Sequence, residues 1–477
     1  MPSTTSPEIS RYRTAISRAD LSAPCRRAME DGLFGRSDTV LDFGCGRGQD
    51  VARLSQGGFR ASGWDPHFSP DGPKAISDLV FLTYVLNVID DPAERRAVLA
   101  EAWSLARSVL VVSTRLTWEK SRVNGDRWAD GLVTSRKTFQ KLYQPDELRA
   151  FVEEATGVRC VAASAGTVYA FKNDTDRLGY LARRVAPDYV WSDATETSEA
   201  LASIVKFAES RGRAPTFDEI PAEQQALLDG VSETKLRQII KRSVSATLLA
   251  DGARRTTLNT LLVLGMEVFS GRAKFSELPL AVRQDIRSHF PSYRDACRRA
   301  DRLLLKLRDK QYIRGAMRNS PGKVTPSALY VHRRAVPSMP VVLRLYEYCG
   351  SVAVGRPPGW TVLKLHHDRD MVSWLDYPEF DSDPHPKLAL SYAVDLKSLV
   401  ASHTSYAERQ NRPLLHRKHE FLTAGDKEYA KYERLTTAEV RAGLYANPSI
   451  IGTEVGWAGE LDRCGVELRG HRLVKKR

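Results

Sequence analysis

Residues 40–50 read Val-Leu-Asp-Phe-Gly-Cys-Gly-Arg-Gly-Gln-Asp, an apolar run that ends in an acid and is followed by three glycines at alternate positions. Glycine is needed where a strand turns sharply into a helix and where the backbone must lie against a ligand, because a Cβ atom would collide there. Residues 51–54 read as that helix, and a second apolar piece over 59–64 is followed by Asp65. The stretch therefore predicts a strand, a ligand-binding loop and a helix in succession.

The spacing of Gly44, Gly46 and Gly48 is G-x-G-x-G, which differs from the dinucleotide pattern G-x-G-x-x-G. It resembles the S-adenosylmethionine (SAM) site of class I methyltransferases, so we predict SAM as the cofactor. The loop would lie against the methionine and the ribose, and Asp65 would accept hydrogen bonds from the ribose hydroxyls. Asp42 would either orient the loop or meet the amino group. The alternatives are a nicotinamide or another nucleotide cofactor, and a plain strand–loop–helix turn.

The bulk composition fits a cytoplasmic protein of two or three domains. The 477 residues exceed one ordinary core. The six cysteines are scattered without a C-x-x-C pair, which is typical of free thiols in a reducing compartment. No apolar run reaches the roughly 18–20 residues that cross a bilayer, and residues 1–8 lack the pattern of a secretory signal. We therefore expect no association with a membrane.

Alternating strand and helix patterns predict an α/β fold for the first part of the chain. Strands are expected at 79–83 and 108–112, helices at 92–106 and 145–154, and a closing hairpin from 158–161 and 167–171. Residues 1–36 are expected to be helical in two pieces, and 115–140 to form a substrate loop. The predicted domains are a Rossmann-like class I methyltransferase domain (1–175), a mostly helical region (176–320) that is basic from 231, and an α+β domain of unknown function (321–477).

The net charge of +13 is concentrated in one block, since residues 231–320 hold nineteen Lys and Arg against eight Asp and Glu. A four-residue spacing within one predicted helix relates Arg294, Arg298, Arg302, Lys306 and Lys310. Such a stripe drifts slowly around a helix and suits contact with a phosphate backbone. We predict a nucleic-acid contact that positions a duplex without reading its bases. The alternative is a solvated face that nearby acids partly neutralise.

Several segments spread over the chain resemble the DNA phosphorothioation-associated methyltransferase family. The segments are 13–18, 21–24, 41–48, 63–66, 84–89, 94–96, 328–333, 377–386 and 414–418. The resemblance implies a SAM-dependent methyltransferase that acts alongside systems placing sulfur in the DNA backbone. It implies DNA as a partner, together with other proteins of the phosphorothioation system, but no established substrate.

The residues that would contact the methyl acceptor are less clearly marked. DNA enzymes that methylate amino groups place an Asp/Asn-Pro-Pro-aromatic tetrad after the fourth strand, where this chain has Tyr84-Val85-Leu86-Asn87. Methylation of cytosine C5 needs a Pro-Cys nucleophile, and the sequence has no Pro-Cys pair. Alignment of donor and acceptor can suffice for methyl transfer. Tyr84 and Asn87 are therefore the candidates for lining the acceptor side, and the alternative is a helix-cap and core role.

The C-terminal part is rich in histidine, with eight of the ten His beyond residue 330. Asp381, Asp383 and His385 alternate in a segment held extended by two prolines, so their side chains could share one face. They could form half of a metal site that His366, Asp368 or His416 completes. The alternatives are a hydrogen-bonded structural network and phosphate contacts through Arg417 and Lys418.

Three hypotheses for function follow from these observations. The first is a SAM-dependent methyltransferase acting on DNA or a nucleic-acid-linked substrate. The second is a non-catalytic, SAM-sensing component of a defence complex that binds nucleic acid. The third adds a nuclease-like activity in the C-terminal half.

Overall fold

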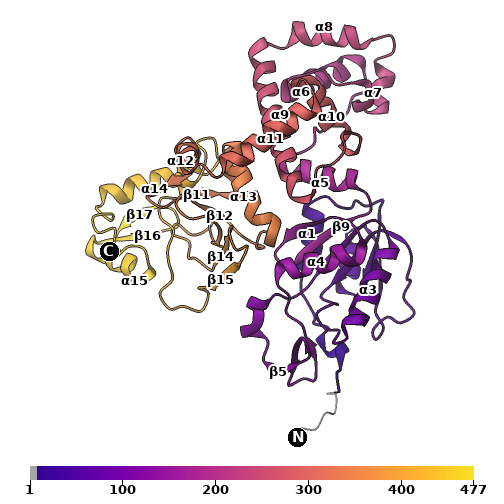
Figure 1. Ribbon diagram of the computed structural model, residues 1–477. Helices are drawn as coiled ribbons and strands as arrows, with labels where there is room; N and C mark the ends of the chain where they lie inside the picture. The colour runs from indigo at the N-terminus through magenta and orange to yellow at the C-terminus, as the bar shows by residue number, and fades with distance from the viewer. Residues whose placement is uncertain (1–7, 477) are drawn as a thin grey trace. The chain divides into compact units, whose positions relative to one another are not determined.

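The computed structural model of the chain describes residues 8–476, apart from the side chains of Ser121 and Arg122 (Figure 1). The expectation about a secretory signal concerns residues that lie almost entirely outside this range. Contacts divide the chain into two compact units. Unit 1 comprises the residues up to 173 together with 320–338 and 347–477, and unit 2 comprises 174–319 and 339–346. The sequence suggested three domains, whereas by contacts most of the first and third fall in unit 1, with residues 339–346 in unit 2.

Unit 1 begins with a six-stranded sheet in the order β2-β1-β3-β4-β9-β8. Its parallel strands are β1 (Thr39–Phe43), β2 (Arg60–Trp64), β3 (Ser77–Thr83) and β4 (Ala106–Ser113). An antiparallel hairpin of β8 (Cys160–Ser164) and β9 (Thr167–Phe171) completes it. The mixed α/β architecture with a parallel sheet, predicted from the alternating patterns, is confirmed.

Helices cover both faces of this sheet. On one face, α3 (Pro92–Leu105) and α4 (Pro145–Thr156) share a buried cluster with Leu41 and Phe43 of β1. Because side chains alternate along a strand, Asp42 points to the other face. There, Cys25 of α1 (Ala23–Glu30) and Asp50 of α2 (Gln49–Gln56) lie close enough to Asp42 for electrostatic interaction. One face of β1 therefore packs in the apolar core, and the other face carries Asp42 toward α1 and α2.

Two segments of unit 1 differ from the sequence-based expectation. The N-terminal residues form only the short helix η1 (Arg11–Thr14) before α1, because side chains of α2 bond the backbone between them. The expected substrate loop at 115–140 contains η2 (Thr117–Arg122) and a small sheet instead of one irregular loop. The strands of that antiparallel sheet are β5 (Gly125–Trp128), β6 (Gly131–Thr134) and β7 (Phe139–Gln140).

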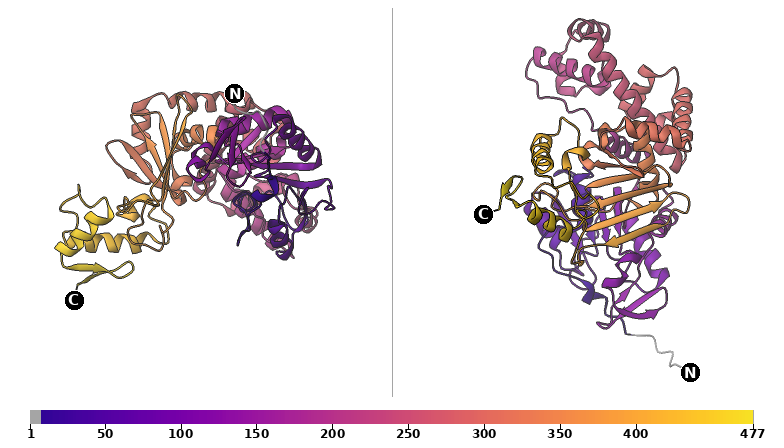
Figure 2. Two further views of the ribbon diagram at one scale, coloured as in Figure 1. Left: turned by 90° about the horizontal axis from the view of Figure 1, so that it is seen from below. Right: turned by 90° about the vertical axis from the view of Figure 1, so that its left-hand side faces the viewer.

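A second, antiparallel sheet forms the C-terminal part of unit 1 (Figure 2). Its strands follow chain order: β10 (Lys323–Val324), β11 (Ala328–His332), β12 (Val362–His366), β13 (Met371–Asp376), β14 (Leu390–Asp395) and β15 (Ala401–Ser405). The helical elements of this part are η6 (Arg333–Ser338), η7 (Lys418–Phe421), α14 (Tyr429–Arg441) and α15 (Glu454–Arg463), and the hairpin of β16 (Val466–Leu468) and β17 (Leu473–Lys475) follows them. Helix α13 (Val341–Val354) is divided between the units, with residues 341–346 in unit 2 and 347–354 in unit 1.

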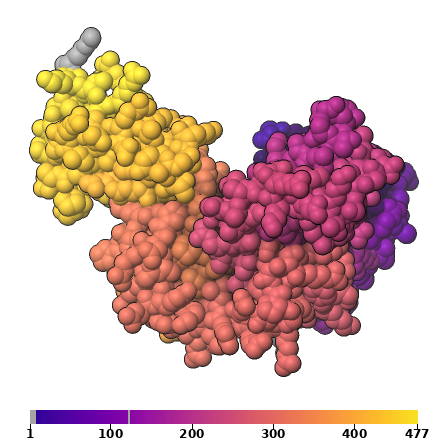
Figure 3. Space-filling model, turned by 90° about the horizontal axis from the view of Figure 1, so that it is seen from above, coloured from indigo at the N-terminus to yellow at the C-terminus, as the bar shows by residue number. Residues whose placement is uncertain are grey.

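Unit 2 is helical, and its residues are magenta to salmon in the space-filling view of Figure 3. Its longer helices are α5 (Asp174–Val185), α6 (Thr197–Arg211), α8 (Glu233–Ser243), α9 (Ala246–Glu267), α10 (Leu280–His289), α11 (Tyr293–Lys306) and α12 (Lys310–Arg318). The shorter ones are η3 (Phe217–Glu219), α7 (Ala222–Leu227), η4 (Val268–Ser270) and η5 (Phe275–Glu277). The long helix α9 packs against α5, α6, α10 and α11. Within residues 8–476, no helix combines the length and apolar character that a membrane span requires.

A buried ion pair joins α5 to α9 in unit 2. The Arg177 guanidinium donates to both carboxylate oxygens of Glu267 at 2.7 and 3.1 Å, and the two side chains are only 1% and 0% exposed. Asp174 accepts a further bond from Arg177 at 2.9 Å. Breaking such a pair leaves a buried charge without compensation, which is costly.

We predict that Glu267→Gln destabilises unit 2 by up to about 3–5 kcal/mol, because it removes the buried bidentate partner of Arg177 and leaves the partly exposed carboxylate of Asp174 to balance that charge. Urea denaturation of the full chain, followed by the helical circular dichroism signal, measures this as a lowered midpoint. The matched control is Glu233→Gln, whose partner Arg237 is 66% exposed. An exposed pair contributes roughly 0–1 kcal/mol, so the control should barely move the midpoint. Equal effects of the two substitutions would contradict the prediction.

Candidate functional site

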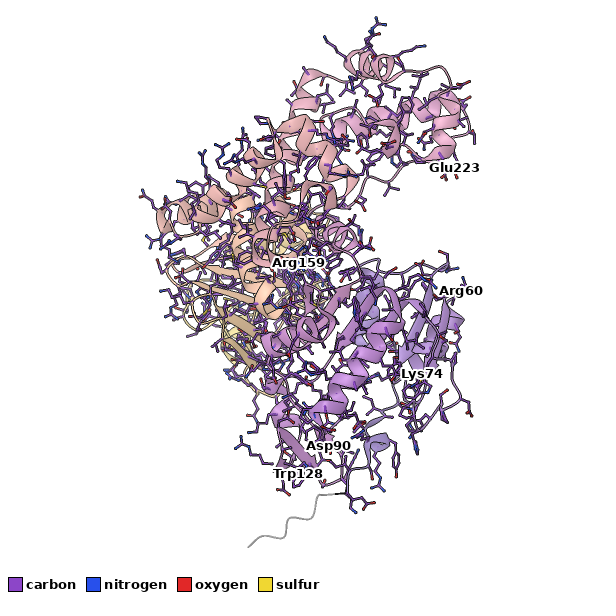
Figure 4. All side chains as sticks on the ribbon, turned by 45° about the vertical axis from the view of Figure 1, so that its right-hand side comes forward. Arg60, Lys74, Asp90, Trp128, Arg159 and Glu223 are labelled. Atoms are coloured by element: carbon purple, nitrogen blue, oxygen red, sulfur yellow. The ribbon has the colours of Figure 1, made fainter. Side chains whose placement is uncertain are left out.

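A cavity of about 550 Å³ lies at the carboxyl ends of β1, β2 and β3. This end of a parallel sheet is where open α/β folds bind ligands. We call it the first cavity. Its wall includes Trp64, and the ammonium group of Lys74 (labelled in Figure 4) lies 3.7 Å from the centre of that ring. Lys74 is held in turn by an ion pair with Glu101 at 2.7 Å.

The glycine-rich loop contributes Gly44 and Gly46 to the wall of the first cavity, whereas Gly48 does not line it. Gly44, Gly46 and Gly48 have φ angles of +88°, +53° and +68°, a region that favours glycine. A Cβ atom on Gly44 would also lie 2.4 Å from Cγ2 of Val85, which leaves no room for a side chain. The N–H groups of Gly44 and Cys45 both donate to the carbonyl oxygen of Trp64, at 2.7 and 3.1 Å. Backbone geometry therefore accounts for the glycine spacing, while a role of these glycines in cofactor binding stays a prediction.

Asp65 braces this loop as well as lining the cavity. One carboxylate oxygen accepts hydrogen bonds from the N–H groups of His67 and Phe68, both at 2.9 Å. The other accepts from the N–H of Gly46 at 3.0 Å. A carboxylate has about four lone-pair sites, so Asp65 keeps some capacity for a ligand donor. The sequence suggested only the ligand-binding role, and the bracing role is an addition from the structure.

Asp42 lies in the same wall and is only 6% exposed. Burial raises the pKa of Asp42 to about 7, the neighbouring carboxylates of Asp50 and Asp65 act in the same direction, and Arg18 opposes them. Its Oδ1 atom has no hydrogen-bond partner among the described residues. A buried polar atom without a partner is costly, so a donor group of a bound ligand is well suited to this position.

This pKa predicts how stability depends on pH. Between the ordinary Asp value near 4 and about 7, folded Asp42 binds more protons than unfolded Asp42, so stability of the ligand-free protein should fall as pH rises through that window. Each pKa unit is worth about 1.4 kcal/mol. Asp42→Asn removes this cost, so its urea midpoint should exceed that of the wild type at pH 8 and match it near pH 4. A difference that does not vary with pH would contradict the assignment.

The N-terminal strap, defined as residues 9–22, contributes several residues to the wall of the first cavity. Arg11 binds both Asp90 (labelled in Figure 4) and Glu94, the first at 2.8 Å. The Tyr12 ring stacks on His67, with ring centres 4.3 Å apart. These contacts fasten the first part of the strap to the start of α3 and to the loop after β2.

The second part of the strap is fastened to α2. The Arg53 guanidinium donates to the carbonyl oxygens of Arg18 and Ala19, at 2.7 and 2.8 Å. Asp50 accepts a hydrogen bond from the N–H of Ser22 at 2.8 Å. The strap residues that line the cavity have no local sequence signal of this position, because their partners are dozens of positions away.

A second cavity of about 540 Å³ adjoins the first, and five residues line both: Thr14, Ile16, Arg18, Tyr84 and Val88. Tyr84 and Asn87, the candidates for the acceptor side, both line the second cavity, and Tyr84 alone of the two also lines the first. Tyr84 therefore lies where the two cavities meet, whereas Asn87 lies in the wall of the second cavity alone, and a chemical role of either residue stays a prediction.

Tyr84 and Asn87 are both unusual in their conformation or bonding. Tyr84 has a φ angle of +59°, which is uncommon and strained for a residue other than glycine. Burial raises the pKa of Tyr84, although a hydrogen bond to Ser113 opposes the shift. Asn87 is 1% exposed and donates from Nδ2 to Gln140 at 3.1 Å, while its Oδ1 atom has no partner among the described residues. Asn87, a wall residue of the second cavity, thus carries a buried acceptor atom without a hydrogen-bond partner among the described residues.

The predicted basic stripe is only partly continuous in the structure. Arg294, Arg298, Arg302 and Lys306 are exposed on α11. The prediction of one helix that includes Lys310 is wrong, because α11 ends at Lys306 and α12 begins at Lys310. The side chain of Asp309 caps the N–H of Tyr312, which starts the new helix.

The candidate metal ligands at the C-terminal end are engaged elsewhere. Asp381 binds Arg334 and accepts a hydrogen bond from the Tyr432 hydroxyl at 3.0 Å. His385 lies 2.7 Å from Glu439, and Asp383 accepts a hydrogen bond from the backbone N–H of His385. Among the described residues, no group of three or more His, Cys, Asp or Glu is arranged to hold a metal ion. These contacts form a hydrogen-bonded network instead of the metal site considered from the sequence.

Comparisons with solved structures cover about a third of this chain. No protein-family model and no curated protein matches the sequence. One similar solved structure is the 1,6-didemethyltoxoflavin-N1-methyltransferase of Burkholderia thailandensis with S-adenosylhomocysteine (SAH), at 19% identity over 31% of this chain and 78% of that chain, with a TM-score of 0.24. Another is the magnesium protoporphyrin IX methyltransferase of Synechocystis PCC 6803 with SAH, at 16% identity over 34% and 93%, with a TM-score of 0.22. At these scores the likeness assigns no function to this chain.

Proposed function

We propose that this protein is a SAM-dependent methyltransferase and that the first cavity holds SAM. The observation that carries the proposal is the unpartnered, buried Oδ1 atom of Asp42 beside a glycine-rich loop at the carboxyl ends of parallel strands. The amino group of a bound methionine moiety would supply the donor that Asp42 lacks. Bound SAM would supply the methyl group for transfer.

The other residues of the first cavity suit the remaining parts of SAM. Gly44 and Gly46 of the glycine-rich loop offer backbone to the methionine and ribose, and Asp65 offers acceptor oxygens to the ribose hydroxyls. The rings of Tyr12 and Phe68 offer flat apolar surfaces for an adenine. A volume of about 550 Å³ lies within the usual 300–1,000 Å³ of small-molecule sites.

The chain's own contribution to catalysis would be alignment. A methyl donor in the first cavity and an acceptor in the second would meet at Tyr84, which lines both. Holding two reactants in attack geometry supplies a large part of the rate enhancement without an acid or a base. The backbone strain at Tyr84 is consistent with a residue kept for its position.

A SAM titration tests this proposal. Isothermal titration calorimetry of the full chain should show binding of SAM and SAH. Asp65→Asn should weaken both at least tenfold, which corresponds to about 1.4 kcal/mol, because the amide reduces the acceptor capacity at the ribose and in the loop brace. Asp42→Asn should also weaken SAM and SAH, because it removes the charge opposite the amino group.

The matched control is Asp71→Asn, an exposed carboxylate of the same domain that does not line the first cavity. It should leave both affinities unchanged, and circular dichroism should show all three variants folded. Binding of NAD in place of SAM, or no binding by a folded protein, would overturn the proposal. Binding without methyl transfer to any nucleic acid would favour a SAM-sensing role instead.

As part of this proposal we place DNA on the exposed face of α11. The exposed cations there follow one another at four-residue intervals, and the surrounding block is strongly basic. The resemblance to the phosphorothioation-associated family favours DNA as the partner, and the comparisons with known proteins do not address it.

The expected signature of this surface is a sequence-independent, salt-dependent affinity. In fluorescence anisotropy with duplex DNA, the combined change of Arg298, Arg302 and Lys306 to Ala should weaken binding and reduce the slope of log K against log salt by about 2–3. The control changes Lys235, Arg237 and Lys241 of α8 to Ala, which removes the same number of exposed cations. If the α8 variant loses affinity and the α11 variant does not, the assignment to α11 is wrong.

A further inference from the structure

Taking the proposed function as its basis, we propose that the second cavity binds an amino-bearing nucleotide and that its aromatic amine is the methyl acceptor. The shared chemistry is a neutral exocyclic amine on a heteroaromatic base whose sugar carries a phosphate, either as a free nucleotide or within a nucleic-acid strand.

The position of the second cavity identifies it as the acceptor side. It shares five wall residues with the first cavity, including Arg18 of the strap and Tyr84 after β3. The Arg18 guanidinium lies 5.5 Å from the centre of the Tyr84 ring, so these two side chains form part of the boundary between the cavities. A group bound in the second cavity is therefore next to anything bound in the first.

The free acceptor atom of Asn87 specifies an N–H donor. Nδ2 of Asn87 is already committed to the side-chain oxygen of Gln140, and that bond fixes Oδ1 as the remaining group. Since Oδ1 is buried and without a partner among the described residues, leaving it so is unfavourable. An N–H of the ligand would satisfy it and hold the amine in the second cavity.

The charges of the second cavity specify an anionic ligand with a neutral amine. Three arginines line the cavity, namely Arg18, Arg26 and Arg115, against the two carboxylates Asp20 and Glu119. Glu119 already accepts a hydrogen bond from the N–H of Leu116 at 2.9 Å. The surplus of guanidinium groups favours phosphate, for which arginine provides matched donors. It disfavours an ammonium group, which also lacks the lone pair needed for attack.

Methyl transfer from SAM to the amine balances with SAM, the nucleotide and water alone. The amine nitrogen forms a bond to the methyl carbon as the S–CH₃ bond breaks, and the sulfur keeps the electron pair, which gives SAH. The N-methylated product then loses one proton to water. Asn87 is neutral, so it orients the amine by a hydrogen bond and takes no proton.

Matched probes test the inference on the full chain saturated with SAH. In calorimetry, dAMP or dCMP should bind at least tenfold more tightly than dTMP, which has the phosphate but no exocyclic amine. Deoxyadenosine, which has the amine but no phosphate, should also bind at least tenfold more weakly than dAMP. Twelve-residue oligonucleotides of dA and dT form a second arm: binding of the dA oligonucleotide without binding of dAMP would place the amine in a strand.

Two substitutions separate the two recognition elements. Asn87→Leu should abolish the preference for dAMP or dCMP over dTMP, and Asn87→Asp, which keeps an acceptor oxygen, should restore part of it. Arg115→Gln should weaken all phosphorylated probes by a similar factor and leave deoxyadenosine unchanged. The control is Arg136→Gln, an exposed arginine nearby in the sequence that does not line the cavity.

The outcomes distinguish this inference from the proposed function. Three outcomes would overturn the inference while SAM binding stands. The first is equal affinity for dTMP and the amino-bearing nucleotides, and the second is no effect of Asn87→Leu and Arg115→Gln. The third is no binding of any nucleotide or oligonucleotide to the SAH-bound protein. Failure of SAH itself to bind the folded protein would refute the proposed function, and the inference with it.

Discussion

The three hydrogen bonds that Asp65 accepts from backbone N–H groups hold the first cavity together. Through them one carboxylate joins the glycine-rich loop after β1 to the turn after β2, so the ends of two adjacent strands form one wall. The loop can approach that carboxylate only because its glycines adopt left-handed conformations and because Gly44 leaves room for Val85. The N-terminal strap and Tyr84, which lies where the two cavities meet, are arranged around that fixed wall.

The parts of this arrangement that depend on local pattern could be predicted from the sequence. The apolar run before Asp42, the glycine spacing and the acid at position 65 follow from how a strand turns into a helix beside a ligand. The closing hairpin of β8 and β9 could also be predicted, because its strands are short apolar runs with a turn between them. Each of these features is encoded in a short continuous stretch of chain.

The parts that depend on distant contacts could not be predicted. Arg11 meets partners 79 and 83 positions away, so its sequence neighbourhood carries no signal of a role at the cavity. The bracing role of Asp65 and the pairing of Asn87 with Gln140 likewise exist only once the chain has folded. The end of α11 was missed for a different reason: a regular charge spacing continues across the break, whereas the cap formed by Asp309 interrupts the helix. A charge pattern describes a surface and does not fix where a helix ends.

The N-terminal strap has a consequence for how the occupancy of the first cavity can be observed. Side chains of α2 and α3 hold residues 9–22 in place, and none of these residues belongs to a strand of the sheet that contains β1 to β4. The strap can therefore detach at a cost much smaller than global unfolding, as local openings generally do. Any ligand that touches both the loop and the strap shifts that local opening equilibrium by its own binding free energy. The rate at which trypsin cleaves after Arg13 or Arg18 thus becomes a measure of whether the cavity is filled, independent of any chemistry that takes place inside it.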